Sequence, residues 1–218
     1  KYAGQNIMIL GNLGAKELNY VSTVKKTTNE VLKRKNISPS DTVKVVKGSA
    51  AITPLINPDK INLIIIPSKN ESFVSNELSA LYQLREKHKK DSIMVFGLEE
   101  WKMIESLDVN YLENLNVHFF STVFADYENQ VTKNFVSKYR KAYSTAPTHY
   151  VFDGFDITYY YLNALKKYGA NFQSRLPDLK WSGIHKKFDF FQSAIESGYE
   201  NRGGYILRLE NYKLIEIK

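Results

Sequence analysis

The stretch that decides the fold is residues 129–168, NQVTKNFVSKYRKAYSTAPTHYVFDGFDITYYYLNALKKY. On either side of Pro147, apolar side chains recur every three or four positions, which is the spacing of one helix face. The expected inward faces are Val131, Phe135, Tyr139 and Ala142 in the first segment, and Phe152, Phe155, Tyr159 and Leu162 in the second. The pattern predicts two packed amphipathic helices joined by a short loop.

Before this stretch, short apolar runs alternate with helical patterns. The run at 61–66, INLIII, is uniformly apolar, which is typical of a parallel strand covered on both faces. The expected strands are 6–10, 42–47, 61–66, 92–96 and 117–120, with a closing hairpin at 204–209 and 212–217. This rhythm predicts an α/β fold: a doubly wound, mainly parallel sheet with extra helices and a C-terminal hairpin. In the first helix we expect Leu18, Val21, Val24 and Leu32 to face inward.

Composition narrows the functional classes. The chain has 218 residues and no cysteine, which excludes disulfides and thiolate metal sites. No apolar run approaches the roughly 18 residues of a membrane span, so none is expected. The sequence begins with lysine and not with methionine, so we expect that the chain has been cut.

The net charge of +7 has two interpretations. A solvated basic surface is favoured over a polyanion-binding one, because the basic clusters at 33–35, 87–90 and 186–187 carry no interleaved aromatic motif. The first two clusters end predicted helices, where cations offset the helix dipole. We therefore expect no nucleic-acid partner.

Catalytic signals are weak throughout the chain. Gly11 to Gly14 lacks the full dinucleotide fingerprint, so a tight turn is favoured over a phosphate cradle. His149 and Asp153 could share a helix face, but the four histidines have no metal-ligand spacing. There is no G-x-S-x-G elbow. We expect no catalytic residues, no metal and no cofactor, and a protein that is not an enzyme.

Loops that follow predicted strands are better candidates for a binding site. In open α/β sheets, ligands bind in the crevice outside the carboxyl ends of the strands. Three loops qualify, and they carry Asn12, then Ser68 and Lys69, then Glu99 and Trp101. These residues are the predicted ligand-binding set within the sheet.

Several motifs resemble the type I periplasmic substrate-binding proteins, which bind branched-chain amino acids and similar solutes. The pattern FVxxYRxxY, a proline, then FDGFDITYYYLNALKKYG is similar to a segment late in those chains. MVFGLEEW resembles their strand-glycine-x-Glu segment, which implies that Glu99 holds a ligand amino group, although Glu100 replaces the glycine expected next. VHFFSTVFADYENQ resembles the strand that crosses the hinge and implies a ligand-facing Tyr127.

The resemblance implies a domain organisation. Residues 1–125 would form the second α/β lobe, residues 126–185 a helical return segment like first-lobe elements, and residues 186–218 the closing strands. A first lobe would lie outside this chain. The implied function is a periplasmic or other extracytoplasmic solute-binding or sensing module that captures a small, polar, amino acid-like ligand by lobe closure. The alternative is a Rossmann-type half-domain of an enzyme that uses nucleotide sugars.

Two partners beyond the ligand are expected. The ending NRGGYILRLENY resembles exported binding-protein-like chains of gut-type anaerobes that are joined to a peptidoglycan-binding LysM module, which implies a peptidoglycan link through a domain outside this chain. Tyr159 to Tyr161 cannot all face one core, because successive helix residues lie about 100° apart. The tyrosines are either half-buried or meet a partner, and we expect a homodimer through helices 129–168.

Overall fold

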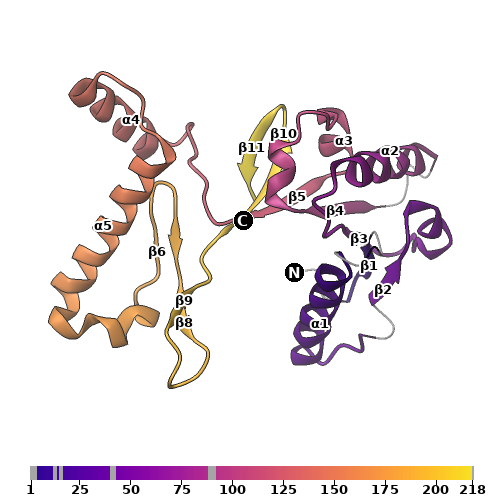
Figure 1. Ribbon diagram of the computed structural model, residues 1–218, viewed down its shortest axis with the longest axis horizontal. Coiled ribbons are helices and arrows are strands. Elements are labelled where there is room, and N and C mark those ends of the chain that lie inside the picture. The colour runs from indigo at the N-terminus through magenta and orange to yellow at the C-terminus, as the bar shows by residue number, and fades with distance from the viewer. Residues whose placement is uncertain (1–3, 12–13, 15–16, 40–42, 88–91, 218) are drawn as a thin grey trace. The chain divides into compact units, whose positions relative to one another are not determined.

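The computed structural model describes residues 4–11, 14, 17–39, 43–87 and 92–217 (Figure 1). The chain folds as two compact units. Unit 1 comprises Lys1–Phe120 and Leu207–Lys218, and unit 2 comprises Ser121–Ile206. The division predicted from the sequence assigns segments to lobes of a resembled protein, so it stays a prediction.

The framework of unit 1 is a seven-stranded sheet with the order β11-β10-β5-β4-β3-β1-β2. Its strands are β1 (Asn6–Leu10), β2 (Val43–Val46), β3 (Asn62–Ile65), β4 (Ile93–Gly97), β5 (Val117–Ser121), β10 (Tyr205–Glu210) and β11 (Lys213–Glu216). The pairings from β2 through β5 are parallel, and β10 and β11 form an antiparallel hairpin. The predicted fold class is confirmed.

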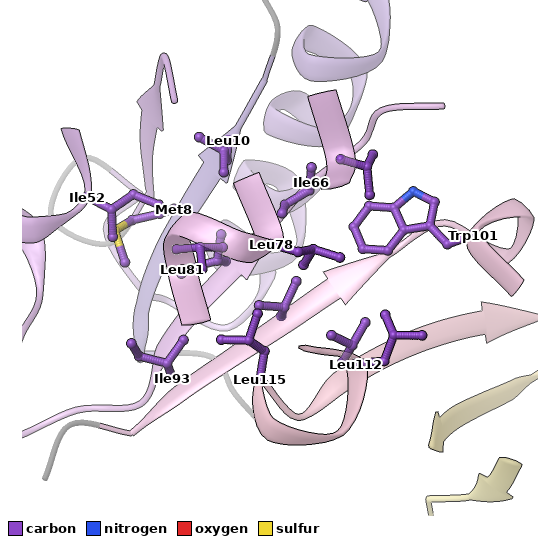
Figure 2. Close-up of a cluster of buried hydrophobic side chains, with 14 of the residues drawn as sticks. Met8, Leu10, Ile52, Ile66, Leu78, Leu81, Ile93, Trp101, Leu112 and Leu115 are labelled. Carbon is purple, nitrogen blue, oxygen red and sulfur yellow. The ribbon is translucent and has the colours of Figure 1, made fainter. Parts of the chain in front are cut away.

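Side chains alternate between the two faces of the sheet, as a pleated strand requires. Met8 and Leu10 of β1 lie in the larger core cluster, together with α2 (Glu71–Lys87) and α3 (Val109–Asn114) (Figure 2). Ile7 and Ile9 face the opposite side, where α1 (Leu18–Arg34) packs. Helices therefore cover both faces, which explains why these strands are apolar throughout.

Helix α1 shows where the hydrophobic pattern misleads. Val21 and Leu32 are buried and Val24 is partly buried, as predicted, but Leu18 is 45% exposed. Leu18 is the first residue of the helix. Short 3₁₀ turns complete unit 1: η1 (Ser49–Ala51), η2 (Thr53–Leu55) and η3 (Glu99–Met103).

Unit 2 consists of two helices, a 3₁₀ segment and four short strands. These are α4 (Gln130–Tyr143), α5 (His149–Tyr168), η4 (Gly169–Asp178), β6 (Trp181–Ser182), β7 (Lys187–Phe188), β8 (Phe190–Gln192) and β9 (Tyr199–Asn201). The two predicted helices are present, and Asn129 caps α4 by accepting a hydrogen bond from the Val131 amide. The predicted inward face of α4 is wrong in part, because Val131 and Ala142 are exposed and the buried residue is Thr132. Strand β6 pairs with β7, and β8 with β9, both antiparallel.

The buried face of α5 differs from the predicted one. The expected stripe contained Phe152, Phe155, Tyr159 and Leu162. Only Phe152 of these is buried, and the other buried positions are Asp156, Tyr160 and Ala164, four residues apart. Tyr160 packs with Leu176 and Phe188 at the centre of the unit 2 core, and its ring stacks on Phe188 at a centroid distance of 4.3 Å.

One buried position on this face of α5 is occupied by a carboxylate, that of Asp156. Asp156 accepts backbone hydrogen bonds from Ile184, His185 and Lys186 at 2.7–2.9 Å. Gly183 is required beside it, because a Cβ there would lie 2.4 Å from the carboxylate. Asp156 thus fixes the turn between β6 and β7 against α5.

Among the described residues, no helix combines the length and apolar character that crossing a bilayer requires.

Candidate functional site

The parallel strands lie in the order β2-β1-β3-β4-β5. The chain adds β2 on one side of β1, and then β3, β4 and β5 on the other side, so the order reverses between β1 and β3. In doubly wound sheets the crevice at such a reversal, outside the carboxyl ends of the strands, is the usual ligand position. The parallel pairing aligns these ends: Ile9 is opposite Ile65, and Ile65 is opposite Phe96. The carboxyl ends of β1, β3 and β4 therefore lie side by side.

Ser68 joins the loop after β3 to the start of α1. Its side chain is fully buried, and its hydroxyl donates a hydrogen bond to Glu17 Oε1 at 2.6 Å. The same hydroxyl accepts the Asn70 amide at 3.1 Å. Glu17 was not in the predicted set, because nothing in the sequence indicates a contact across 51 positions.

The second carboxylate oxygen of Glu17, Oε2, is buried and accepts no hydrogen bond from the described part of the chain. Glu17 is also the N-cap residue that precedes α1, and its side chain does not cap the helix. A buried acceptor without a donor is costly. The Ser68 contact thus places beside the loop after β3 a buried carboxylate oxygen that could accept from a donor such as an ammonium group.

Trp101 supports the loops from beneath. The indole is 1% exposed, and its Nε1 donates to the Ser68 carbonyl at 2.8 Å. Its ring meets Phe119 edge to face, at 6.3 Å between centroids. Gly97 permits this packing, because a Cβ there would lie 2.4 Å from the indole. Trp101 lies in the larger core cluster (Figure 2), where it positions the loops after β3 and β4.

Charged side chains at the mouth of the crevice are paired. Lys69 forms an ion pair with Glu100 that joins the loops after β3 and β4. This hydrogen-bonded contact raises the pKa of Lys69 above its ordinary value and lowers the pKa of Glu100. Glu99, the predicted ligand residue, instead forms a local pair with Lys102 at 2.7 Å.

An apolar pocket of about 310 Å³ adjoins the same loops. Its lining comes from α1, β3, β4, β5 and the loops that follow β3 and β4: Val24, Leu63, Ile65, Ile66, Pro67, Phe96, Gly97, Leu98 and Phe120. Phe120 remains half-exposed at the pocket. The pocket could receive a small apolar group, and a sequence pattern of buried strands gave no sign of it.

Two predicted residues remain, Tyr127 and Asn12. Tyr127 belongs to unit 2, where its exposed ring meets Phe152 edge to face at 6.2 Å. Asn12 lies outside the described residues. Within the described ranges, no three His, Cys, Asp or Glu side chains gather in a way that could hold a metal ion.

Comparisons with known proteins identify the fold. No family model matches the sequence, and no curated protein matches it. Solved structures do match: one assigned to a branched-chain amino acid ABC transporter from Rhodospirillum rubrum has a TM-score of 0.58 and 13% identity. A substrate-binding protein of an ABC transporter from Desulfitobacterium hafniense matches with a TM-score of 0.53, and its complex with Leu with 0.50, both at 13% identity.

In each case the alignment covers 98% of this chain and 61% of the solved one, so the chain spans about three fifths of those proteins. The chain therefore shares the fold of these ABC transporter binding proteins over three fifths of their length. At this identity the likeness defines the fold. The ligand has to be argued from the residues of the crevice.

Proposed function

We propose that the chain is a solute-binding or sensing module of the extracytoplasmic type I binding-protein class, and not an enzyme. The observation that carries this proposal is the crevice at the sheet reversal, where Glu17 and Ser68 lie beside an apolar pocket. The similar structures are transport substrate-binding proteins, which does not favour the nucleotide-sugar enzyme.

The donor set suits a small amino acid-like ligand with an apolar side chain. The free Oε2 of Glu17 would accept a hydrogen bond from the ligand ammonium, and the 310 Å³ pocket would take the side chain. Ser68 and Trp101 act as positioning residues: Ser68 orients Glu17, and Trp101 holds the Ser68 carbonyl. Lys69 and Glu99 at the mouth, with Asn12 and Tyr127, remain proposed ligand contacts.

Capture by closure of two lobes belongs to the same proposal. Because the described crevice is lined by unit 1 and is open, binding by this chain is expected to be no tighter than about 1 μM, or about −8 kcal/mol. A second lobe would add contacts and exclude water from the ion pair.

The test uses nuclear magnetic resonance on the ¹⁵N-labelled 218-residue chain, titrated to millimolar concentrations with leucine and with 4-methylpentanoate. The two compounds share an apolar end and a carboxylate, and only leucine has an ammonium group. We expect leucine to shift the amides of Ser68, Gly97 and Leu98 and the second compound to bind more weakly.

Glu17→Gln should abolish this preference for leucine, whereas Glu30→Gln, an exposed residue on the same helix, should preserve it. Equal binding of the two compounds by the unmodified chain, or leucine-induced shifts that map away from these loops, would contradict the assignment.

A further inference from the structure

The opposite edge of the unit 1 sheet contains a polar cavity of about 440 Å³. It lies at the amino ends of β4 and β5 and beside the turn between β10 and β11, far along each strand from the candidate ligand crevice. Helices α2 and α3 contribute Arg85 and Glu113 to its lining. Its polar lining contrasts with the apolar pocket described above: Arg85, Ser92, Glu113, Asn116, Arg208, Glu210 and Asn211.

The charged side chains that line this cavity differ in whether they have hydrogen-bond partners. Glu210 is paired with Arg208, whose Nη2 lies 2.5 Å from Glu210 Oε2. Glu113 accepts the backbone amide of Tyr212 at 2.7 Å. Arg85 differs, because its Nη1 is buried and donates to no acceptor within the described residues.

Arg208 and Asn116 are already fixed around this space. Arg208 Nη1 donates to Asn116 Oδ1 at 3.2 Å, which holds the guanidinium against the start of β5. Asn116 itself has a φ of 52°, a left-handed conformation that asparagine and aspartate tolerate. Two guanidinium groups on separate elements thus line one cavity, and Nη1 of Arg85 has no acceptor among the residues that the structure describes.

We propose that this cavity is a second binding site of unit 1, which takes an oxyanion through Arg85 and Arg208. A buried guanidinium N–H without an acceptor is costly, and a phosphate or carboxylate group matches its donor geometry in a bidentate manner. The volume exceeds that of a single water and falls within the range of small-ligand pockets. The site accepts a small molecule that carries either group.

The test is isothermal titration calorimetry of the 218-residue chain with inorganic phosphate and, separately, with acetate, at constant ionic strength. Constant ionic strength is needed because salt screens exposed charges. We expect saturable binding of at least one anion, and the stronger of the two identifies the group. Arg85→Gln should weaken this binding by about tenfold or more, because it removes a charged hydrogen bond. Arg34→Gln, at an exposed position on α1, should bind as the unmodified chain does.

Asn116→Asp provides a variant expected to fold normally, because aspartate keeps the oxygen that accepts from Arg208 and tolerates the same φ. Its added negative charge should also weaken anion binding, with an unchanged circular dichroism spectrum. The proposal is overturned if neither anion binds saturably, or if Arg85→Gln and Asn116→Asp bind as the unmodified chain does. Either result leaves the leucine titration unaffected, since those shifts are read at the other edge of the sheet.

Discussion

The indole nitrogen of Trp101 donates a hydrogen bond to the carbonyl oxygen of Ser68, 2.8 Å away. This contact links the turn after β4 to the loop after β3 from inside the core, and the Ser68 hydroxyl on the other side of the same residue holds Glu17. Ser68 therefore contacts the core through its carbonyl oxygen and the candidate ligand residue Glu17 through its hydroxyl. A change in the core at Trp101 should be felt in the crevice.

Trp101→Phe tests this coupling. The substitution removes a buried donor and leaves a void, so we expect the free energy of unfolding to fall by about 2–4 kcal/mol. Urea denaturation followed by circular dichroism measures the loss. Trp181→Phe, at a half-buried site of unit 2, is the matched control and should cost less. Equal losses in the two variants would contradict this prediction.

Asp156→Asn should destabilise unit 2 more than its small change in size suggests. The carboxylate accepts three backbone N–H groups, and an amide would direct its own NH₂ at one of them. We expect a loss of about 3 kcal/mol in thermal or urea unfolding. Asp178→Asn, which alters an exposed pair with Arg175, should change stability little. A near-neutral Asp156→Asn would show that the turn is held by other contacts.

Burial raises the pKa of Tyr160 to about 12. A raised pKa in the folded state means that the stability is fully present below the unfolded value of 10 and is lost as pH rises toward 12, by about 2–3 kcal/mol over that window. Tyr160→Phe should remove this part of the alkaline loss. It should also cost about 1 kcal/mol at neutral pH, because the hydroxyl donates to the Leu179 carbonyl at 2.9 Å. Urea unfolding at a series of pH values compares the two proteins, and identical pH profiles would refute the assignment.

The Lys69–Glu100 pair has a pH signature of its own. Glu100 has a lowered pKa, so its contribution to stability is present above its unfolded pKa and is lost as pH falls through the folded one. Lys69 has a raised pKa, so its contribution is lost only as pH rises through that folded value. Glu100→Gln should return the Lys69 pKa toward normal, measured by NMR titration of the lysine side chain, while Glu105→Gln should not. Both side chains are half-exposed, so the effect on stability should be small.

We also predict self-association through α4 and α5. Phe155, Tyr159 and Leu162 are each 40–59% exposed and follow one stripe of α5, which is unusual for side chains of this size. Analytical ultracentrifugation across a concentration series should detect a dimer that Phe155→Asp disrupts. Ile195→Asp, which changes an exposed residue of unit 2 outside these helices, should leave it intact. A monomer at high concentration would contradict the prediction.

The strands could be predicted from the sequence because each is a short apolar run covered on both faces. The run around Ile64, for instance, is predictable in this way, since both faces of β3 meet helices. The inward face of α5 was predicted wrongly, because hydropathy excludes Asp156 from a core. Its burial depends on three amides about 30 residues further along the chain.

The candidate site was predictable only in outline. That loops after β3 and β4 would converge follows from parallel pairing, so Ser68 and Trp101 could be selected. Glu17 could not, since its bond to Ser68 depends on where α1 starts relative to a loop 51 positions away. The ion pair between Lys69 and Glu100 could not be predicted either. Glu99 and Glu100 are adjacent, and nothing in the sequence shows which of them faces Lys69.

Unit 1 is built from two separate pieces of chain, with unit 2 between them. Strand β10, which neighbours β5 in the sheet, is therefore made by the ribosome only after the whole of unit 2. Until then β5 presents an unpaired edge to the cell, and open edges invite pairing with other chains. A nascent chain halted within unit 2 would thus be prone to aggregate until residues 207–218 have been made.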